Sequence, residues 1–212
     1  MKTITQKTFI KIAGLSSVVI ALILFALFMV GNRKNVDLKD LPINYLHGNF
    51  SVDVDNPREI VGDADYYFVA RVESIDGTEY RHAVTIETED GFKEVSSPYT
   101  NYTITIIQNL KGLLVQDVPI SILKSGGVNK DEKSITLYEQ DFLPEIGQYY
   151  VISAYAQKDG SLLISGPNSN ELLPDVSKSR LSHDNNYEQY QKYFDEEVAV
   201  ERERYTSIYD KK

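Results

Sequence analysis

The sequence predicts a mainly β protein: a small closed barrel or sandwich, preceded by one transmembrane helix and followed by an amphipathic C-terminal helix. Three observations predict this fold class. The N-terminal part holds a long uncharged apolar run, about six or seven short β-type segments then alternate with turn residues, and the C-terminal part shows helical spacing of aromatic residues. No β-type segment is followed by a long amphipathic one, which argues against a parallel α/β fold.

The apolar run, residues 13–31, reads AGLSSVVIALILFALFMVG and contains no charged residue. At about 1.5 Å per residue a helix of this length reaches about 28 Å, enough to cross the hydrocarbon layer of a bilayer. A soluble core helix would carry polar residues on one face, and this run has almost none. Phe28 and Met29 are too bulky for a signal-peptide cleavage site, which favours an uncleaved anchor over a cleaved signal peptide. We therefore expect residues 13–31 to contact the lipid bilayer.

Lysine and arginine residues are nearly balanced on the two sides of this run, so the positive-inside rule does not decide the orientation. A short basic N-terminus is the usual arrangement of a signal anchor, and the chain beyond the run is acidic. We therefore expect residues 1–12 in the cytoplasm. The sequence predicts a single-pass plasma-membrane protein whose C-terminal domain is extracytoplasmic.

Composition excludes several function classes. The chain has 212 residues, 42% of them hydrophobic, which suffices for one domain with a core but hardly for two. The formal net charge of −9 argues against a nucleic-acid partner, because phosphates need a basic face. The chain has no cysteine, which excludes disulfides, thiolate nucleophiles and cysteine-ligated zinc. An extracytoplasmic domain without cysteine suits a Gram-positive cell surface.

Residues 32–57 are rich in Asn, Asp and Pro and predict a juxtamembrane stalk that begins to dock near Leu41. Residues 58–175 hold the β-type segments and form the predicted barrel domain. Each segment alternates apolar with polar residues or closes at a turn pair such as Asp76-Gly77. The predicted strands lie within residues 60–76, 81–88, 101–110, 118–124, 134–138, 149–157 and 162–165.

Residues 176–212 predict a linker and a C-terminal helix over residues 185–208, which lack glycine and proline. Tyr190, Phe194 and Val198 recur every four residues and form an apolar stripe on one helix face. The stripe has three interpretations: it packs on the barrel, it binds a partner or a second copy, or the segment is a mobile tail.

Five stretches carry a family resemblance: ADYYFVARVESI, YTNYTITIIQNLKG, VPISILKSGG, LPEIGQYYVISAY and GSLLISGPN. Their order and turn glycines, over about residues 58–175, resemble the OB-fold barrels of the netrin/tissue-inhibitor-of-metalloproteinase-like class, here as a bacterial membrane-anchored surface protein. The resemblance implies an OB-like barrel and a general expectation of binding. The animal inhibitors of this class act through N-terminal cysteines, which this chain lacks, so proteinase inhibition is not implied.

No catalytic pattern stands out. A G-x-S-x-G elbow is absent, and the histidines fall in predicted stalk, hairpin and linker: His47, His82 and His183. Ser125-Gly126-Gly127 follows a strand, but no helix follows it, so a turn is favoured over a phosphate site. Glu145 precedes a predicted strand within a Pro-Glu-Ile-Gly turn and has no catalytic partner in any motif. We expect no catalytic residue and no cofactor.

Three acidic stretches carry paired carboxylates that could bind a metal ion, but none has EF-hand spacing. These are Asp53/Asp55, Asp63/Asp65 and residues 129–133. We interpret all three as solvated turns and expect no metal ligand.

The most suggestive polar loop is Gly166-Pro167-Asn168-Ser169-Asn170. Asn168, Ser169 and Asn170 have side chains that suit either a turn or hydrogen bonds to a glycan or peptide. The sequence thus predicts a membrane-anchored binding or assembly module at the cell envelope, with an envelope protein or cell-wall partner. Two alternatives stay open: a hydrolase with an unrecognised site, and an accessory subunit that docks through its Tyr-rich helix.

Overall fold

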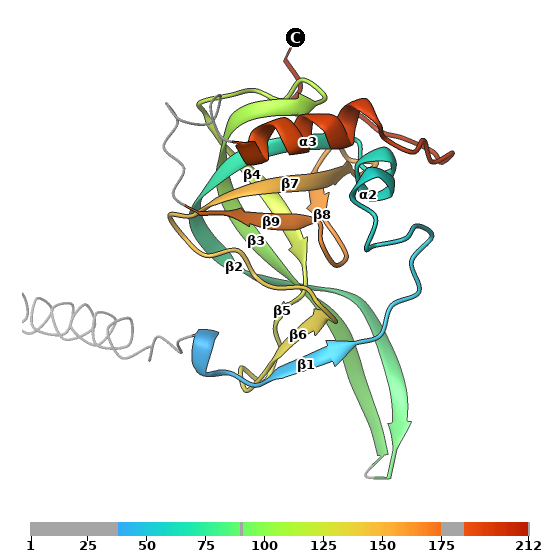
Figure 1. The fold of residues 1–212 in the computed structure, drawn as a ribbon. Coiled ribbons are helices and arrows are strands. Elements are labelled where there is room, and N and C mark those ends of the chain that lie inside the picture. The colour runs from blue at the N-terminus through green and yellow to red at the C-terminus, as the bar shows by residue number, and fades with distance from the viewer. Residues whose placement is uncertain (1–37, 90, 175–184, 212) are drawn as a thin grey trace, which may run out of the picture. The chain divides into compact units, whose positions relative to one another are not determined.

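The computed structural model describes residues 38–89, 91–174 and 185–211 (Figure 1). The chain divides into two compact units, Met1–Asp40 and Leu41–Lys212. The described part of the first unit is the short 3-10 helix η1, Leu38–Asp40. The predicted span 13–31 and the predicted cytoplasmic residues 1–12 lie outside the described residues. Over the residues that are described, no helix has the length and apolar character needed to cross a membrane.

A closed five-stranded barrel forms the centre of the second unit. Its strands follow one another around the ring in a fixed order: β2 (Tyr66–Thr88), β3 (Gly91–Lys111), β4 (Pro119–Ser125), β8 (Leu162–Ile164) and β7 (Tyr149–Ala156). The ring closes because β7 pairs back with β2. All neighbours are antiparallel except β4 and β8. A closed barrel is therefore confirmed over a sandwich, and this order is compatible with an OB-like barrel.

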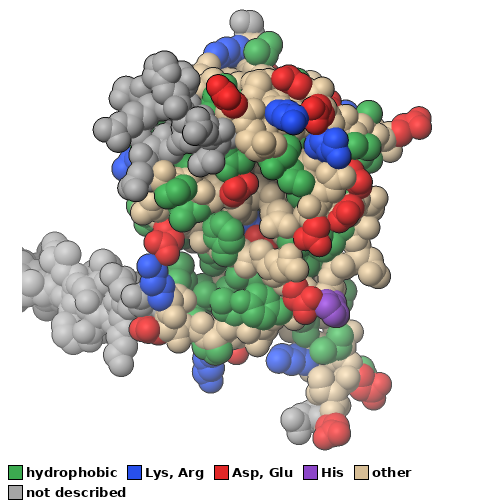
Figure 2. All heavy atoms as spheres, viewed as in Figure 1, with side chains coloured by type: hydrophobic (Ala, Val, Ile, Leu, Met, Phe, Trp, Pro, Cys, Tyr) green, Lys and Arg blue, Asp and Glu red, His purple; other side chains and the backbone are tan. Residues whose placement is uncertain are grey.

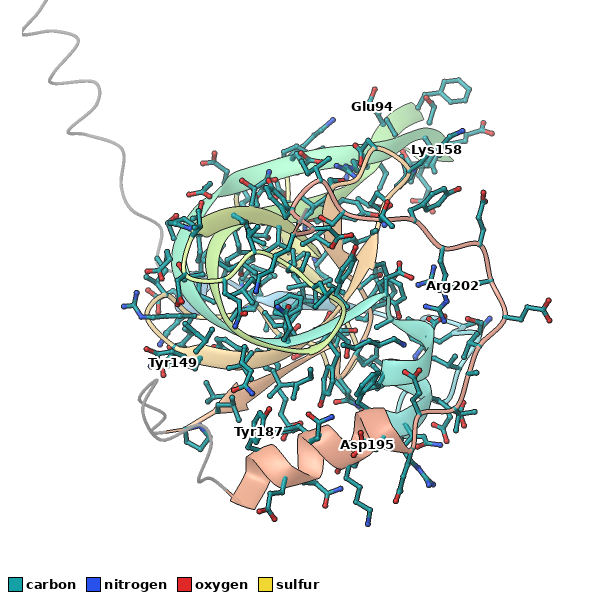
Figure 3. The ribbon with its side chains drawn as sticks, turned by 90° about the horizontal axis from the view of Figure 1, so that it is seen from above. Glu94, Tyr149, Lys158, Tyr187, Asp195 and Arg202 are labelled. Atoms are coloured by element: carbon teal, nitrogen blue, oxygen red, sulfur yellow. The ribbon has the colours of Figure 1, made fainter. Side chains whose placement is uncertain are left out.

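The barrel interior is filled by side chains that alternate along the strands, as expected for a closed sheet (Figure 3). In β3, Tyr102, Ile104 and Ile106 are buried, whereas Thr103 and Thr105 between them are partly exposed. The predicted alternation of this strand is confirmed. Four of the five barrel strands supply most of the large, fully buried residues of this core cluster, and Leu114, after β3, adds one more. Those from the strands are Phe68, Tyr102, Ile104, Ile106, Tyr150, Ile152, Leu162 and Ile164.

Strands β2 and β3 run beyond the barrel as a two-stranded arm (Figure 1). The predicted strands 60–76 and 81–88 are therefore wrong as separate elements, because β2 is one strand of 23 residues with register shifts along it. Residues 60–63 of the first predicted strand are not strand but the end of helix α2 (Pro57–Asp63). Asn56 caps this helix by accepting a hydrogen bond from Arg58 N at 3.2 Å, and Pro57 occupies its first turn, where proline is favoured.

A second, three-stranded sheet is built from β1 (Ile43–Leu46), β6 (Ile135–Tyr138) and β5 (Gly127–Val128), in that order. The stalk predicted up to residue 57 thus contains a strand, since β1 pairs in parallel with β6. Hydrophobic side chains gather over this sheet on the face shown in Figure 2. Its exposed members include Ile43, Tyr45 and Leu46 of β1.

The helix predicted over residues 185–208 is too long by 13 residues, because helix α3 (Asn185–Asp195) ends at Asp195. Residues 196–211, which we name the C-terminal strap, run without regular helix. Their backbone makes hydrogen bonds elsewhere in the unit: Val198 N donates to Arg58 O at 3.0 Å, and Lys211 N donates to Leu113 O at 2.8 Å. These tertiary bonds override the helical propensity of the segment.

Candidate functional site

A pocket of about 410 Å³ lies against the outer side of the barrel. Its volume is within the range of sites that bind small ligands. Five elements contribute to its walls: α2, β2, β7, β9 (Asn170–Leu173) and α3. They pack together through a second hydrophobic cluster, whose buried members are Val61, Tyr67, Val69, Leu110, Val151, Leu173 and Tyr190. The lining includes Asp55, Tyr67, Phe142, Asn168, Asn170, Glu171 and Tyr193.

Asn170 is the unusual member of this lining. It begins β9, where its backbone pairs with Ile152 of β7, and its side chain is only 2% exposed. Neither Nδ2 nor Oδ1 has a hydrogen-bond partner among the described residues. A buried amide without partners costs about 1–3 kcal/mol, so native structures rarely keep one without a reason.

The neighbouring loop residues are used by the fold itself. Asn168 adopts a left-handed backbone with φ of 56° and donates from Nδ2 to Val54 O at 2.8 Å. Ser169 is buried and donates from Oγ to Ser165 O at 2.6 Å. These two hydrogen bonds stabilise the loop, and Asn168 also lines the pocket. Asn170 alone of the three has a side chain left unsatisfied.

The charge of the lining is acidic. Asp55 and Glu171 line the pocket, and none of the described residues in its lining is a Lys or an Arg. Glu171 accepts a hydrogen bond from the Tyr190 hydroxyl at 2.7 Å. Burial raises the pKa of the Tyr67 hydroxyl well above its ordinary value, helped by neighbouring Tyr190 and Glu171. The pocket therefore disfavours anionic ligands and keeps Tyr67 neutral.

The predicted stripe on the C-terminal helix is not one exposed face. Tyr190 is buried at 6% exposure, and Phe194 packs partly buried against the second hydrophobic cluster. Val198 is 44% exposed but lies in the strap, beyond the end of α3. Tyr190 and Phe194 thus pack on the barrel, which is one of the three interpretations of the stripe.

An arginine cluster holds the strap to the start of the barrel, and sequence reasoning missed it. Asp63 and Asp65, interpreted as a solvated turn, instead bind Arg202, at 3.1 Å to Asp63 Oδ1 and 2.7 Å to Asp65 Oδ1 (Figure 3). Arg204 reaches Asp65 Oδ1 at 3.0 Å and Gly62 O at 2.6 Å. The i, i+2 spacing of the acids is present in the sequence, but their partners lie about 140 residues away, so no local pattern joins them.

The structure also places Glu145 and the acidic side chains that were considered as metal ligands. Glu145 is exposed in the turn before β7, where its backbone N donates to the Tyr150 hydroxyl at 2.9 Å and Gly147 takes a φ of 84°. This is the turn entry that the Pro-Glu-Ile-Gly stretch predicted. Among residues 38–89, 91–174 and 185–211, no three His, Asp or Glu side chains form a group able to hold a metal ion.

Comparisons with known proteins identify no family. No family model matches the chain, and no curated protein matches it. The closed barrel is compatible with an OB-like fold. Membership of the netrin/tissue-inhibitor-of-metalloproteinase-like class stays a prediction.

Proposed function

We propose that the chain is a membrane-anchored, extracytoplasmic binding module of the cell envelope, which acts by binding and not by catalysis. Its anchor is the uncharged run 13–31, and its barrel belongs to the OB-like class that the sequence resembles. The observation that carries the binding role is the unpartnered, buried amide of Asn170, a residue of the pocket lining. The five-stranded closure of the barrel supports the OB-like assignment.

The chemistry of the pocket points to an uncharged ligand that carries an amide group. The Asn170 side chain offers one acceptor and an NH₂ donor, and the complement of that pair is another amide, with its own N–H and C=O. The acidic residues Asp55 and Glu171 disfavour an anion, while Phe142 and Tyr193 offer apolar and aromatic surface. Two cell-envelope sources share this chemistry: an N-acetylated sugar and a peptide.

Calorimetric titration of the full-length chain in mild detergent tests this proposal. One arm uses an N-acetylglucosamine oligosaccharide, and the other uses a dipeptide acetylated at its N-terminus and amidated at its C-terminus. We expect binding in one arm, and Asn170→Leu should weaken it by about 10–100-fold, because two hydrogen bonds to the ligand are lost.

The matched control is Asn129→Leu, since Asn129 lies outside the pocket and uses both ends of its amide, with Ser134 and Thr136. This variant should bind as the wild type does. Absence of binding in both arms, or equal binding by Asn170→Leu, would overturn the assignment of the pocket.

The membrane topology has its own test. A protease added to cells whose wall has been removed should degrade residues 32–212 and spare a fragment that contains residues 1–31. If residues 32–212 are protected from the protease in these cells, whose wall is removed and whose membrane is intact, they lie in the cytoplasm. That result would refute the extracytoplasmic role.

A further inference from the structure

A lysine and an aspartate face each other inside the barrel. Lys124 lies on β4 opposite Thr100 of β3, two residues after Ile122, and therefore points to the same interior face as that isoleucine. Asp141 lies in the segment between β6 and β7. The Lys124 Nζ contacts Asp141 Oδ2, and their side chains are 0% and 1% exposed.

The surroundings of this pair are apolar or neutral. Asp141 Oδ1 accepts a hydrogen bond from the backbone N of Phe142 at 2.8 Å. Tyr102, on the interior face of β3, is 1% exposed, and its hydroxyl has no hydrogen-bond partner among the described residues. Both side chains are almost completely shielded from solvent by the residues that the structure describes. The two groups thus meet in a dry site.

We propose that Lys124 and Asp141 condense to an intramolecular isopeptide bond, which cross-links β4 to the segment before β7. The neutral amine nitrogen of Lys124 attacks Cγ of the protonated Asp141 carboxyl group, and a C–N bond forms. The C–O bond to the protonated oxygen breaks, that oxygen takes a proton from the amine, and one water molecule leaves. No atom is oxidised or reduced, so the step needs no co-reactant.

The geometry places each reacting group where the step requires it. The amine is held against Oδ2, the oxygen that leaves, while Oδ1 keeps the Phe142 N–H that stabilises negative charge as it develops on this oxygen. Holding two reactants in place corresponds to effective molarities of about 10⁵–10⁸ M in well-oriented intramolecular reactions. Such proximity favours amide formation at a site from which water is excluded.

Protonation states favour the same step. Burial lowers the pKa of the Lys124 amine and raises the pKa of the Asp141 carboxyl group, and in each case the partner's charge opposes the shift. Two buried charges are costly, and the neutral pair avoids that cost. An amide would remove the charges permanently and would give a chain without cysteine a covalent cross-link.

Mass spectrometry of the denatured full-length protein tests the proposal. We expect the wild type to be lighter than its sequence by one water molecule. Trypsin should leave the chain uncut after Lys124 and should release one branched peptide that joins the Lys124 and Asp141 segments. The measurement needs no variant to fold, because the wild type alone gives the answer.

Variants sharpen the test. Lys124→Met and Asp141→Ala should show no loss of water, whereas Lys111→Ala should keep it, since Lys111 forms a more exposed ion pair with Glu197 at 2.6 Å. Loss of water can also arise at Asp-Gly sequences such as Asp159-Gly160. A wild type of unmodified mass, or a water loss that maps to an Asp-Gly pair and not to Lys124, would show a plain ion pair and overturn the proposal.

Discussion

Replacing Asn170 with leucine should stabilise the protein, which is the opposite of what most buried substitutions do. The wild-type amide is 2% exposed, and both of its polar atoms lack partners among the described residues. A buried polar group in this state costs about 1–3 kcal/mol, and leucine, which has the same branching at Cγ, removes it. Without ligand, we therefore expect the free energy of unfolding of Asn170→Leu to exceed that of the wild type by about 1–3 kcal/mol.

Urea unfolding of the full-length chain in mild detergent, followed by circular dichroism, measures this difference. The midpoint should rise while the slope of the transition stays unchanged. Asn129→Leu is the matched control, because it removes an amide whose two ends are paired at 2.8 and 2.9 Å. That control should lose about 1–2 kcal/mol.

If Asn170→Leu loses stability as Asn129→Leu does, the Asn170 amide is satisfied in the native state, and the argument for a ligand at this residue fails. A gain in stability joined to a loss of binding would instead mark Asn170 as a residue kept for function at the expense of the fold.

Three further predictions concern the strap and its contacts. Arg202→Ala should lower the free energy of unfolding by about 2–3 kcal/mol, because two largely buried carboxylates lose hydrogen bonds; Lys192→Ala, in an exposed pair at 3.9 Å, should change it by less than about 0.5 kcal/mol, and equal losses would refute this. Gly62→Ala should cost about 1–3 kcal/mol in the same assay, because a Cβ there would lie 1.8 Å from Val198 O, and an unchanged midpoint would contradict this close approach. Burial raises the pKa of the Tyr66 hydroxyl to about 12, above an unfolded value of about 10, so its stabilising effect is complete below about pH 10. The stability advantage of the wild type over Tyr66→Phe should therefore shrink from pH 10 toward pH 12, and a constant advantage would contradict the shift.

Alternation of apolar and polar residues was enough to predict a mainly β domain, either a closed barrel or a sandwich, and the pairing of β7 with β2 decided between them. The strand around Ile104 and the strands that became β4, β6, β7 and β8 lie where the pattern places them. Burial on one face imposes a period of two on such strands, so the signal is present in each segment by itself. The turn before β7 was predictable for the same reason, since Pro144 and Gly147 act locally.

Elements that depend on distant partners were not predictable in this way. Strand β1 is exposed at all four residues and exists only because it pairs with β6. The segment beyond Asp195 has good helical composition, yet its backbone groups and arginines find partners on α2 and near Leu113. Pairings across such sequence distances leave no periodicity that a single segment can show.

The site residues divide along the same line. Asn170 was predicted from its residue type and loop, but that its amide lacks partners follows only from the packing of β9 against β7. Lys124 carried a signal that went unused: it shares the parity of Ile120 and Ile122, so the alternation of its strand already places a lysine on the interior face. A charged residue in an apolar register calls for a partner, and the partner, Asp141, could not be named from the sequence.

Helix α2 links the strap to the pocket, because its residues serve both. Ile60 and Val61 line the pocket, while the carbonyl groups of Gly62 and Asp63 accept hydrogen bonds from the strap arginines. With only seven residues, this helix is too short to be stable alone, so its position depends on those contacts. A change in the strap should therefore weaken ligand binding as well as stability, whereas Asn170→Leu should weaken binding and raise stability. The opposite signs separate residues that position the wall of the pocket from the residue that contacts the ligand.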